Sequence, residues 1–324
     1  EYIVEEGATL HIEEGVKIIA VYDDIADYIL VKQGGKINAV GTPDKPIVMT
    51  SEKEEPGAWG GIHICGRAHT NAEGGKGSSE IGGAVYGGND DADNSGTLQY
   101  IRLEYTGFAF DEEHEANGIS FYGVGNGTIV DHCQAYKGSD DGFEFFGGSV
   151  NVSNLVAVSC SDDSFDWTEG WNGKGTNLVA YQEDKSTLGY DCDCLMECDN
   201  NGSNNAATPV AHPVLKNLIL VGNGGSKQGI RLRAGTEVEI DNAKVCGKGQ
   251  PLTVETALTE NALKNGTSKL TNITLTSELS SKEGIYTHAD FIAVTSNKVD
   301  ANLSYSSFED IRKECSWMNG SWVK

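Results

Sequence analysis

A repeat of about 22 residues constrains the fold of this chain more than any other feature. Residues 118–141, 142–163 and 164–185 each hold an alternating apolar strand, a Gly-rich turn, a second short strand and a polar turn. This period is typical of one turn of a β-helix and too short for a helical repeat. The sequence therefore predicts an all-β fold, a right-handed parallel β-helix.

Aligned repeats place apolar residues in columns. Two columns of the first strand are Ile119, Phe143, Phe165 and Phe121, Phe145, Trp167. Successive strand residues face opposite sides, so Ser120, Glu144 and Asp166 should point outward. The column of the second strand is Ile101, Cys133, Leu155, Leu178, Leu218, Ala243 and Ile273. We expect the core to contain Leu155, Leu178, Leu220, Phe143 and Phe165.

The residue before this second column is usually asparagine. The series is His132, Asn154, Asn177, Asn217, Asn242 and Asn272. Asparagine that recurs at one corner of a solenoid predicts a ladder in which each amide bonds to its copy in the next turn.

We expect one domain over residues 1–324, with roughly ten turns. Long loops are predicted at about 66–96 and 191–212. The only convincing helical segment lies near the C-terminus, so a cap at about 305–324 is expected to cover that end of the solenoid. Residue 1 falls inside a repeat-like pattern, so the chain is expected to be a mature or trimmed product.

The formal charge of −24, from 48 acidic and 24 basic residues, bears on partners. It disfavours nucleic acid and anionic membranes and favours cations, above all Ca²⁺. Solubility alone would also explain most of these acids. No apolar run is long enough to span a membrane.

Eight cysteines in a Gly- and Asn-rich acidic chain suit an oxidising compartment, so we expect a secreted or cell-surface protein. Cys133 should stay free because its column is apolar. The spacing of the Cys192, Cys194 and Cys198 cluster does not match zinc motifs. The disulfide candidates are Cys192, Cys194, Cys198, Cys160, Cys246 and Cys315.

Seven Asn-x-Ser/Thr sequons are glycosylation candidates if the source is eukaryotic. They lie at Asn126, Asn151, Asn201, Asn265, Asn272, Asn302 and Asn319.

Two acid pairs form the sharpest polar feature. Asp140-Asp141 and Asp162-Asp163 occupy the same corner of adjacent turns, which lie about 4.8 Å apart. Four carboxylates this close need protons, water or a cation. They predict a Ca²⁺ site, or turns in which one Asp of each pair accepts backbone hydrogen bonds.

Other groups could bind a ligand. Glu144 and Asp166 stack near the acid pairs, where they could hold a cation or a glycan. Asp90, Asp91 and Asp93 form a second acidic loop that could bind Ca²⁺ irregularly. Trp171 and other aromatic residues beside glycines could stack on sugar rings, although most could equally cap the core.

The motifs GGKINAVGTPDKPIVMTS, GAWGGIHICGRAHTN, YGGNDDADNSGTLQYIRLEYTG and GSDDGFEFFGG carry a family resemblance. Over residues 5–185 the chain resembles a group of secreted bacterial β-helix proteins, many of them surface proteins of unassigned activity. These are related in architecture to pectate lyases. The resemblance implies the fold and an exported location, and it implies no particular reaction.

Two enzyme comparisons remain incomplete. Pectate-lyase-like enzymes use a cationic base, and Arg231 or Arg233 could supply one. With regular turns, these arginines would lie about four turns, on the order of 20 Å, from the acid pairs. Polygalacturonase-like hydrolases also use a Gly-His-Gly element, and no histidine here stands between two glycines.

Three functions follow. The leading one is a non-catalytic extracellular protein that binds glycans or other surface partners, or builds an assembly, with Ca²⁺ as a stabilising ion. The alternatives are a polysaccharide lyase or hydrolase acting on acidic polymers, and a structural subunit that self-assembles into an extracellular filament.

Overall fold

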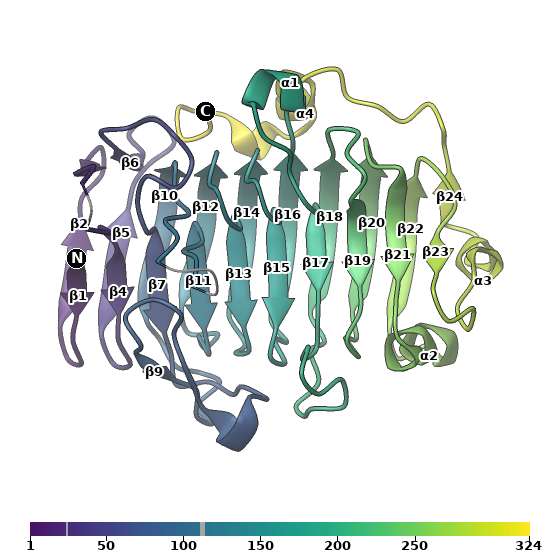
Figure 1. Ribbon diagram of the computed structural model, residues 1–324, viewed down its shortest axis with the longest axis horizontal. Helices are drawn as coiled ribbons and strands as arrows, with labels where there is room; N and C mark the ends of the chain where they lie inside the picture. The colour runs from purple at the N-terminus through teal and green to yellow at the C-terminus, as the bar shows by residue number, and fades with distance from the viewer. Residues whose placement is uncertain (24, 111–113) are drawn as a thin grey trace.

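The computed structural model, which describes residues 1–23, 25–110 and 114–324, is a right-handed parallel β-helix. Two large sheets of parallel strands run along its whole length (Figure 1). Each turn contributes one strand to each sheet, and the described residues give ten strands along the path of either sheet. The fold class and the number of turns predicted from the repeat are confirmed.

The first sheet, here called sheet A, has the shorter strands. In spatial order it contains β1 (Tyr2–Val4), β4 (Ile29–Val31), β7 (Ile62–Cys65), β11 (Ile119–Tyr122), β13 (Phe143–Phe146), β15 (Phe165–Thr168), β17 (Met196–Cys198), β19 (Gln228–Leu232), β21 (Gln250–Val254) and β23 (Ser280–Ser281).

The second sheet, sheet B, has longer strands that bend at one corner. Its path is β2 (Thr9–Ile12), β5 (Lys36–Val40), β10 (Gly96–Glu104), β12 (Ile129–Tyr136), β14 (Asn151–Val158), β16 (Lys174–Tyr181), β18 (Val214–Val221), β20 (Glu239–Cys246), β22 (Lys269–Leu275) and β24 (Lys298–Val299). Two further strands extend it near the N-terminus, β3 (Lys17–Ala20) and β6 (Ile47–Ser51).

The residues that the sequence alignment places in one column are paired with one another in neighbouring strands of the structure. Phe143 pairs with Phe165 in sheet A, and their rings stack with centroids 5.6 Å apart. Leu155 pairs with Leu178 in sheet B. These four side chains are buried in one core together with Leu220, and the inward position of Cys133 is also confirmed. Burial on this scale is the main stabilising term of the fold.

The predicted asparagine ladder is present at the bend of sheet B. Asn177 Nδ2 donates to Asn154 Oδ1 at 2.8 Å, Asn217 to Asn177 at 3.1 Å, and Asn242 to Asn217 at 2.9 Å. Each of these residues has a positive φ between 56° and 63°. Asparagine tolerates this left-handed conformation better than most residues, so it suits both the corner and the ladder. Asn272 bonds instead to Asp241.

Both predicted loops contain regular structure. Residues 66–96 include the 3₁₀ turn η1 (Glu73–Gly75) and a small antiparallel hairpin of β8 (Gly77–Ser78) and β9 (Val85–Tyr86). Residues 191–212 include β17, which pairs with β15 and β19 as a full turn of sheet A. The loop prediction was wrong there, because β17 is short and its strand residues include a charge and a cysteine.

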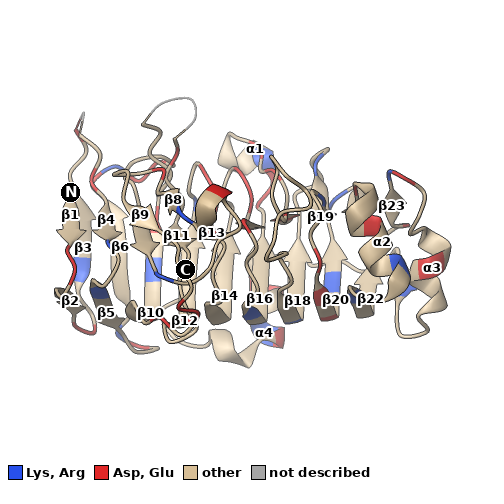
Figure 2. Ribbon diagram, turned by 90° about the horizontal axis from the view of Figure 1, so that it is seen from below, with Lys and Arg blue, Asp and Glu red and all other residues tan. Residues whose placement is uncertain are grey.

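The predicted C-terminal cap lies on the flank of the solenoid and not at its end. The helices α4 (Phe308–Glu314) and η2 (Ser316–Met318) cover outward-facing apolar residues of sheet B, including Val156 and Val179 (Figures 1 and 2). Alternate residues on this face are apolar, so they need a cover. The chain ends near the middle of the molecule, where Lys324 Nζ lies 3.1 Å from Glu104 Oε2.

The end of the solenoid that follows β22 is covered by other elements. The helices α2 (Ala257–Asn265) and α3 (His288–Ala293) lie at this end, opposite the N-terminus (Figure 2). The short helix α1 (Lys185–Leu188) lies on the upper edge in Figure 1. In the described part of the chain, no helix combines the length and apolar character needed to cross a membrane.

Substitutions of Asn217 test its two roles, which are to form the hydrogen-bonded ladder and to adopt a positive φ at the bend. Asn217→Ala should lower the free energy of unfolding by about 2 kcal/mol, because two exposed hydrogen bonds are lost and alanine is strained at φ 60°. Asn217→Gly should cost only about half as much, since glycine accepts a positive φ. Denaturant unfolding measures both.

The matched control is Asn38→Ala. Asn38 lies on β5 with an extended backbone, so its replacement should change stability by less than about 0.5 kcal/mol. Equal losses for the alanine and glycine variants of Asn217 would contradict the conformational part of this explanation.

Candidate functional site

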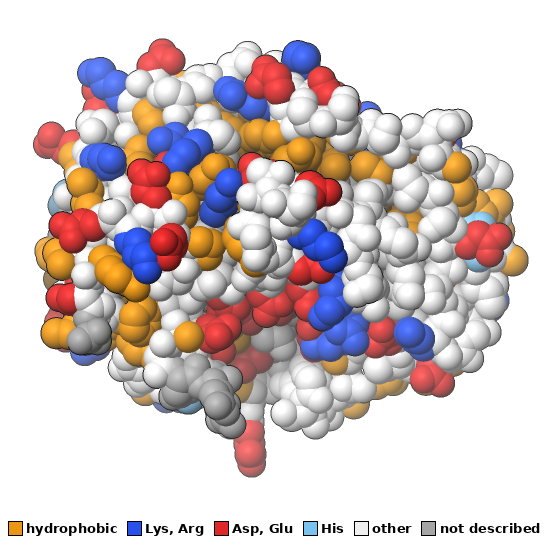
Figure 3. Space-filling model, turned by 45° about the horizontal axis from the view of Figure 1, so that its top comes forward, with side chains coloured by type: hydrophobic (Ala, Val, Ile, Leu, Met, Phe, Trp, Pro, Cys, Tyr) orange, Lys and Arg blue, Asp and Glu red, His pale blue; other side chains and the backbone are white. Residues whose placement is uncertain are grey.

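Acidic side chains gather on one edge of the solenoid, where the chain turns from sheet B into sheet A. In a view that brings this edge forward, they lie in a hollow of the surface with Lys and Arg side chains beside it (Figure 3). The turns before β13, β15 and β17, and the outward-facing positions of these strands, carry acidic residues that stack along this edge.

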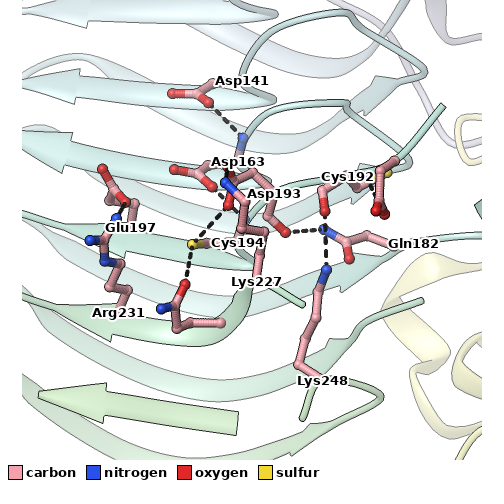
Figure 4. Close-up of polar contacts among 12 residues, drawn as sticks. Asp141, Asp163, Gln182, Cys192, Asp193, Cys194, Glu197, Lys227, Arg231 and Lys248 are labelled. Atoms are coloured by element: carbon pink, nitrogen blue, oxygen red, sulfur yellow. Dashed lines mark hydrogen bonds and ion pairs between the residues drawn. The ribbon is translucent and has the colours of Figure 1, made fainter. Parts of the chain in front are cut away.

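The second aspartate of each acid pair has a structural role. Asp141 Oδ1 accepts a hydrogen bond from the backbone N–H of Asp163 at 2.8 Å. Asp163 Oδ1 accepts in turn from the N–H of Cys194 at 2.6 Å (Figure 4). Both aspartates are only 5% exposed. One carboxylate oxygen of each aspartate therefore accepts a backbone hydrogen bond, as predicted. The bond joins its turn to the following turn.

Two columns of charged residues cross the same turns. The strand register aligns Glu144, Asp166, Glu197 and Arg231 on the outward face of sheet A. Continuing this register through the preceding turns aligns Asp140, Asp162, Asp193 and Lys227. Both columns are acidic on β13, β15 and β17 and become basic at β19.

The basic residues at β19 neutralise the acids of the adjacent turn. Lys227 Nζ pairs with Asp193, and Arg231 Nη1 lies 2.9 Å from Glu197 Oε2 (Figure 4). Arg233 pairs with the same Glu197 and lies 2.7 Å from Asp199. The acids of the third turn are thus fully partnered.

The acids of the two preceding turns have no such partner. Within the described ranges 1–23, 25–110 and 114–324, no ion pair reaches the following six residues, which we call the uncompensated cluster: Asp140, Asp141, Glu144, Asp162, Asp163 and Asp166.

The carboxylate oxygens of this cluster converge. One oxygen from each of Asp140, Asp141 and Asp162 lies within 4.8 Å of the others. The same holds for Asp141, Glu144 and Asp166. The structure thus brings Asp140, Asp141 and Asp162 of the predicted acid pairs together with both predicted ligand-binding acids, whereas Asp163 converges with residues of the next turn.

A third convergent group is a poorer cation site. It joins Asp163, Cys194 and Glu197. Burial raises the pKa of the Cys194 thiol, and Glu197 is already paired with two arginines. A neutral thiol and a neutralised carboxylate offer a cation little.

Crowding perturbs the acids strongly. Burial, and then the charge of Asp162, raises the pKa of Asp140 to about 7. Burial, and then Asp193, raises the pKa of Asp162 to about 6. Burial and neighbouring carboxylates raise the pKa well above its usual value for Asp141, Glu144, Asp163 and Asp166. A group of this kind holds protons at neutral pH unless a cation replaces them.

The second predicted Ca²⁺ loop does not form a site. Asp93 Oδ2 accepts from the N–H of Arg67, and Asp91 Oδ1 bonds to the N–H and ring Nδ1 of His69. Asp90 Oδ1 accepts from the N–H of Ala92. These carboxylates hold the loop against the solenoid, and in the described residues they do not converge as a ligand set.

Trp171 is part of the core and is not exposed for stacking on a sugar ring. It is 1% exposed, stacks on Phe145 with centroids 4.1 Å apart, and donates from Nε1 to Val150 O. The prediction was wrong because an aromatic residue beside turn glycines can equally fold inward. Of the aromatic residues considered for sugar stacking, only Trp317 is not buried; the buried ones are Trp59, Tyr86, Tyr105, Tyr122, Trp171 and Trp322.

The predicted disulfides are absent. All eight cysteines are buried free thiols, including the six candidates Cys192, Cys194, Cys198, Cys160, Cys246 and Cys315. Cys198 lies in the strand register and packs in the core, while Cys194 bonds to the two neighbouring turns through its N–H to Asp163 Oδ1 and its thiol to Gln228 Oε1, so neither closes a loop. The cysteine argument for an oxidising compartment therefore loses its support.

The sequons differ in access. Six of the seven asparagines are exposed, namely Asn126, Asn151, Asn265, Asn272, Asn302 and Asn319. Asn201 is half-buried and donates from Nδ2 to Asn71 Oδ1. Asn272 Nδ2 is bonded to Asp241. These last two amides would lose a hydrogen bond on glycosylation.

The arginines lie closer to the acids than predicted. Arg231 is on β19, two turns from Asp166, because β17 is the only turn between them. The estimate of about four turns was wrong, since residues 191–212 were read as a loop. Arg231 is nonetheless held by Glu197 and by Glu255, whose Oε1 lies 3.3 Å from Nε.

Sequence reasoning missed several residues of this site. Asp193 continues the column of Asp140 and Asp162, and the alignment of Asp193-Cys194 with the two acid pairs would have found it. Asn117 donates from Nδ2 to Glu144 Oε2 at 2.6 Å. Glu80 folds over from the hairpin region, accepts from Tyr122 Oη at 3.2 Å, and has its pKa raised by burial to about 7. No local pattern predicts Glu80.

The comparison with known families agrees with this architecture. A family described as pectate-lyase-like β-helix domain matches residues 1–323. The chain belongs to this family. No curated protein and no solved structure matches it. The family match accounts for the β-helix fold. It does not assign a chemical role to the acidic hollow.

The raised pKa values predict an unusual dependence of stability on pH. A carboxyl whose pKa is higher in the folded state contributes stability at low pH that is lost as pH rises through the folded pKa. In chelator, the melting temperature should therefore fall by a few degrees between pH 5.5 and pH 8, through the values near 6 and 7 of Asp162 and Asp140.

The variant Asp140→Asn with Asp162→Asn isolates this effect. Burial lowers the pKa of His63 to about 4, which acts in the opposite direction below pH 6.5. The difference between wild type and variant removes this contribution. If the melting temperatures of the two proteins change with pH in parallel, the pKa values of Asp140 and Asp162 are not raised in the folded state.

Proposed function

We propose that this chain is a non-catalytic, Ca²⁺-dependent binding protein for acidic polysaccharides that acts outside the cell. The single observation that carries the proposal is the uncompensated cluster. Five of its six carboxylates, from two successive turns, converge in two groups that share Asp141, whereas the next turn pairs its acids with Lys227, Arg231 and Arg233.

Ca²⁺ matches the donor set of the cluster. Asp140, Asp141 and Asp162 offer oxygen atoms alone, from turns whose spacing is set by the strand ladder. Ca²⁺ takes about six to eight oxygens in flexible geometry, whereas Mg²⁺ requires a near-regular octahedron. Three protein oxygens leave several positions for water or for a ligand.

An acidic polysaccharide fits the surroundings of such an ion. Asp162 is exposed, so an ion bound there faces solvent and could accept the carboxylate of a uronate. Lys227, whose side chain is 54% exposed, lies two turns further along and, although it is paired with Asp193, can donate hydrogen bonds to the same polymer. Extracellular Ca²⁺ is abundant enough for a site of modest affinity, which is the reason for placing the protein outside the cell.

Two features favour binding over lyase chemistry. To act as a base, an arginine must first be deprotonated. Arg231 is ion-paired with Glu197 and Glu255, and these pairs raise its pKa, so it stays protonated. Burial lowers the pKa of Lys248, which lies against the turn before β17, but this lysine is only 4% exposed and its Nζ donates to Cys192 O and Asn223 Oδ1, so it is not free to reach a substrate. A lyase of the pectate-lyase type would lack its base here.

Hydrolysis is the second candidate, favoured by one observation. Asp140 and Asp162 have pKa values near 7 and 6, the range of a general acid and base. Their oxygens, however, lie within 4.8 Å of each other. Glycosidases separate their two carboxyl groups by about 5–5.5 Å or about 6.5–9.5 Å to place a sugar between them. Oxygens within 4.8 Å of each other can bind one shared cation, and that is the arrangement we propose.

The filament alternative has less support. The elements α2 and α3 cover the end of the solenoid after β22, where a following copy would have to stack (Figure 1). Self-assembly through another surface is not part of the proposal.

Calcium should stabilise the protein by mass action. At Ca²⁺ concentrations near one hundred times the dissociation constant, the gain is about 2.7 kcal/mol, seen as a rise in melting temperature. Asp140→Asn with Asp162→Asn should reduce the rise, because two of the converging carboxylates are lost. Asp193→Asn is the matched control, because Asp193 lies in the same column but pairs with Lys227, so its variant should keep the response.

A panel of uronate polymers then tests the ligand. Retention of one polymer on immobilised protein in Ca²⁺, its release by chelator, and no unsaturated or reducing sugar in the flow-through are expected. Superimposable melting curves in Ca²⁺ and chelator would end the proposal, and release of cleaved sugar would replace binding with catalysis.

A further inference from the structure

Five of the six carboxylates of the uncompensated cluster form two groups that share one residue. The outer group is Asp140, Asp141 and Asp162, and the inner group is Asp141, Glu144 and Asp166. Asp141 belongs to both. The inner group includes two outward-facing residues of sheet A, and the outer group lies on the turns before β13 and β15.

Each group has the size of one coordination shell. Two oxygens bound to the same Ca²⁺ ion can be at most about 5 Å apart, twice the bond length of about 2.3–2.6 Å. In either group the three ligand oxygens lie within 4.8 Å of one another. Each group is therefore compact enough to bring its oxygens to a common ion with little rearrangement.

Charge favours two ions over one. The two groups together contain five carboxylates. One Ca²⁺ ion would leave a net charge of about −3 in a partly buried site, and two ions would leave about −1. The described cations do not supply the difference, because Arg231 and Arg233 are bound to the acids of β17 and neighbouring turns.

Two buried oxygens without partners point to a ligand at the inner group. Asp166 Oδ1 is buried and has no hydrogen-bond partner, and the same is true of Asn117 Oδ1. Asn117 is 1% exposed, and its Nδ2 donates to Glu144 Oε2 at 2.6 Å, so its carboxamide lies against the inner group. Buried polar atoms in native structures are nearly always satisfied, and a cation would satisfy both oxygens.

We propose that the cluster holds two Ca²⁺ ions, with Asp141 as the carboxylate that bridges them. The inner ion is structural: Asp141, Glu144 and Asp166 bind it, and Asn117 Oδ1 supplies a neutral oxygen. The outer ion, at Asp140, Asp141 and the exposed Asp162, keeps open positions for the ligand. This inference rests on the proposed Ca²⁺ binding and adds a second site with a separate role.

Stoichiometry tests the inference directly. Isothermal titration of the wild-type chain with Ca²⁺, checked by native mass spectrometry, should give two ions per chain. Glu144→Gln with Asp166→Asn should bind one ion, and Asp140→Asn with Asp162→Asn should also bind one. Asp193→Asn, the control with a partnered acid, should bind two.

Asn117→Ala provides a milder variant if the double substitution at the inner site fails to fold. It removes only the neutral oxygen, so one of the two ions should bind about tenfold more weakly while the other is unchanged. The uronate polymer should still be retained by Asn117→Ala in Ca²⁺, because the outer ion remains.

The outcomes separate the two proposals. One ion in the wild-type chain, or two ions in Glu144→Gln with Asp166→Asn, would overturn the second site and leave the proposed Ca²⁺ binding standing. No ion in the wild-type chain would overturn both.

Discussion

In-register stacking of parallel strands is the constraint on which the rest of this structure depends. Turns about 4.8 Å apart place each side chain directly on its counterpart in the next turn, so a residue type repeated at one position becomes a column. Phenylalanine and leucine columns make the core, and asparagine at the bend makes a hydrogen-bonded ladder. The same geometry makes any repeated charge costly, because the chain cannot move like charges apart without breaking the register.

In the acidic hollow, neighbouring turns reduce the repulsion between stacked carboxylates in two different ways. On β17, the acids are neutralised by Lys227, Arg231 and Arg233 of the next turn. On β13 and β15, burial and mutual repulsion raise the pKa values of the acids, and the residues described provide no cation. A rigid scaffold that keeps such a cluster together resembles the preorganised sites that bind ions or ligands, where the fold has already met the energetic cost of bringing the charges together.

The sequence predictions were correct where the repeat is regular and wrong where it is interrupted. Where the period of about 22 residues is regular, the register of Phe143 on Phe165 and of Leu155 on Leu178 came out correctly, as did the positions of the acid pairs. Where the period is broken, the predictions were wrong. The strand β17 was interpreted as a loop because it is short and carries a cysteine and a glutamate, and that error misplaced Arg231 and suggested disulfides that the structure lacks. Trp171 was ambiguous because a residue at a turn can face either way.

The sequence by itself determined the β-helix, the columns of its core, the asparagine ladder and the stacking of Asp140 and Asp141 on Asp162 and Asp163, because all of these follow from one repeated spacing. Only the tertiary structure decided which oxygen of each pair is used by the backbone, that Glu144 and Asp166 join the same cluster, and that Asn117 and Glu80 border it. It also placed the C-terminal helix on the flank of sheet B. These contacts join residues that no repeat relates, and they depend on side-chain direction and on how loops fold back across the turns, which sequence spacing does not encode.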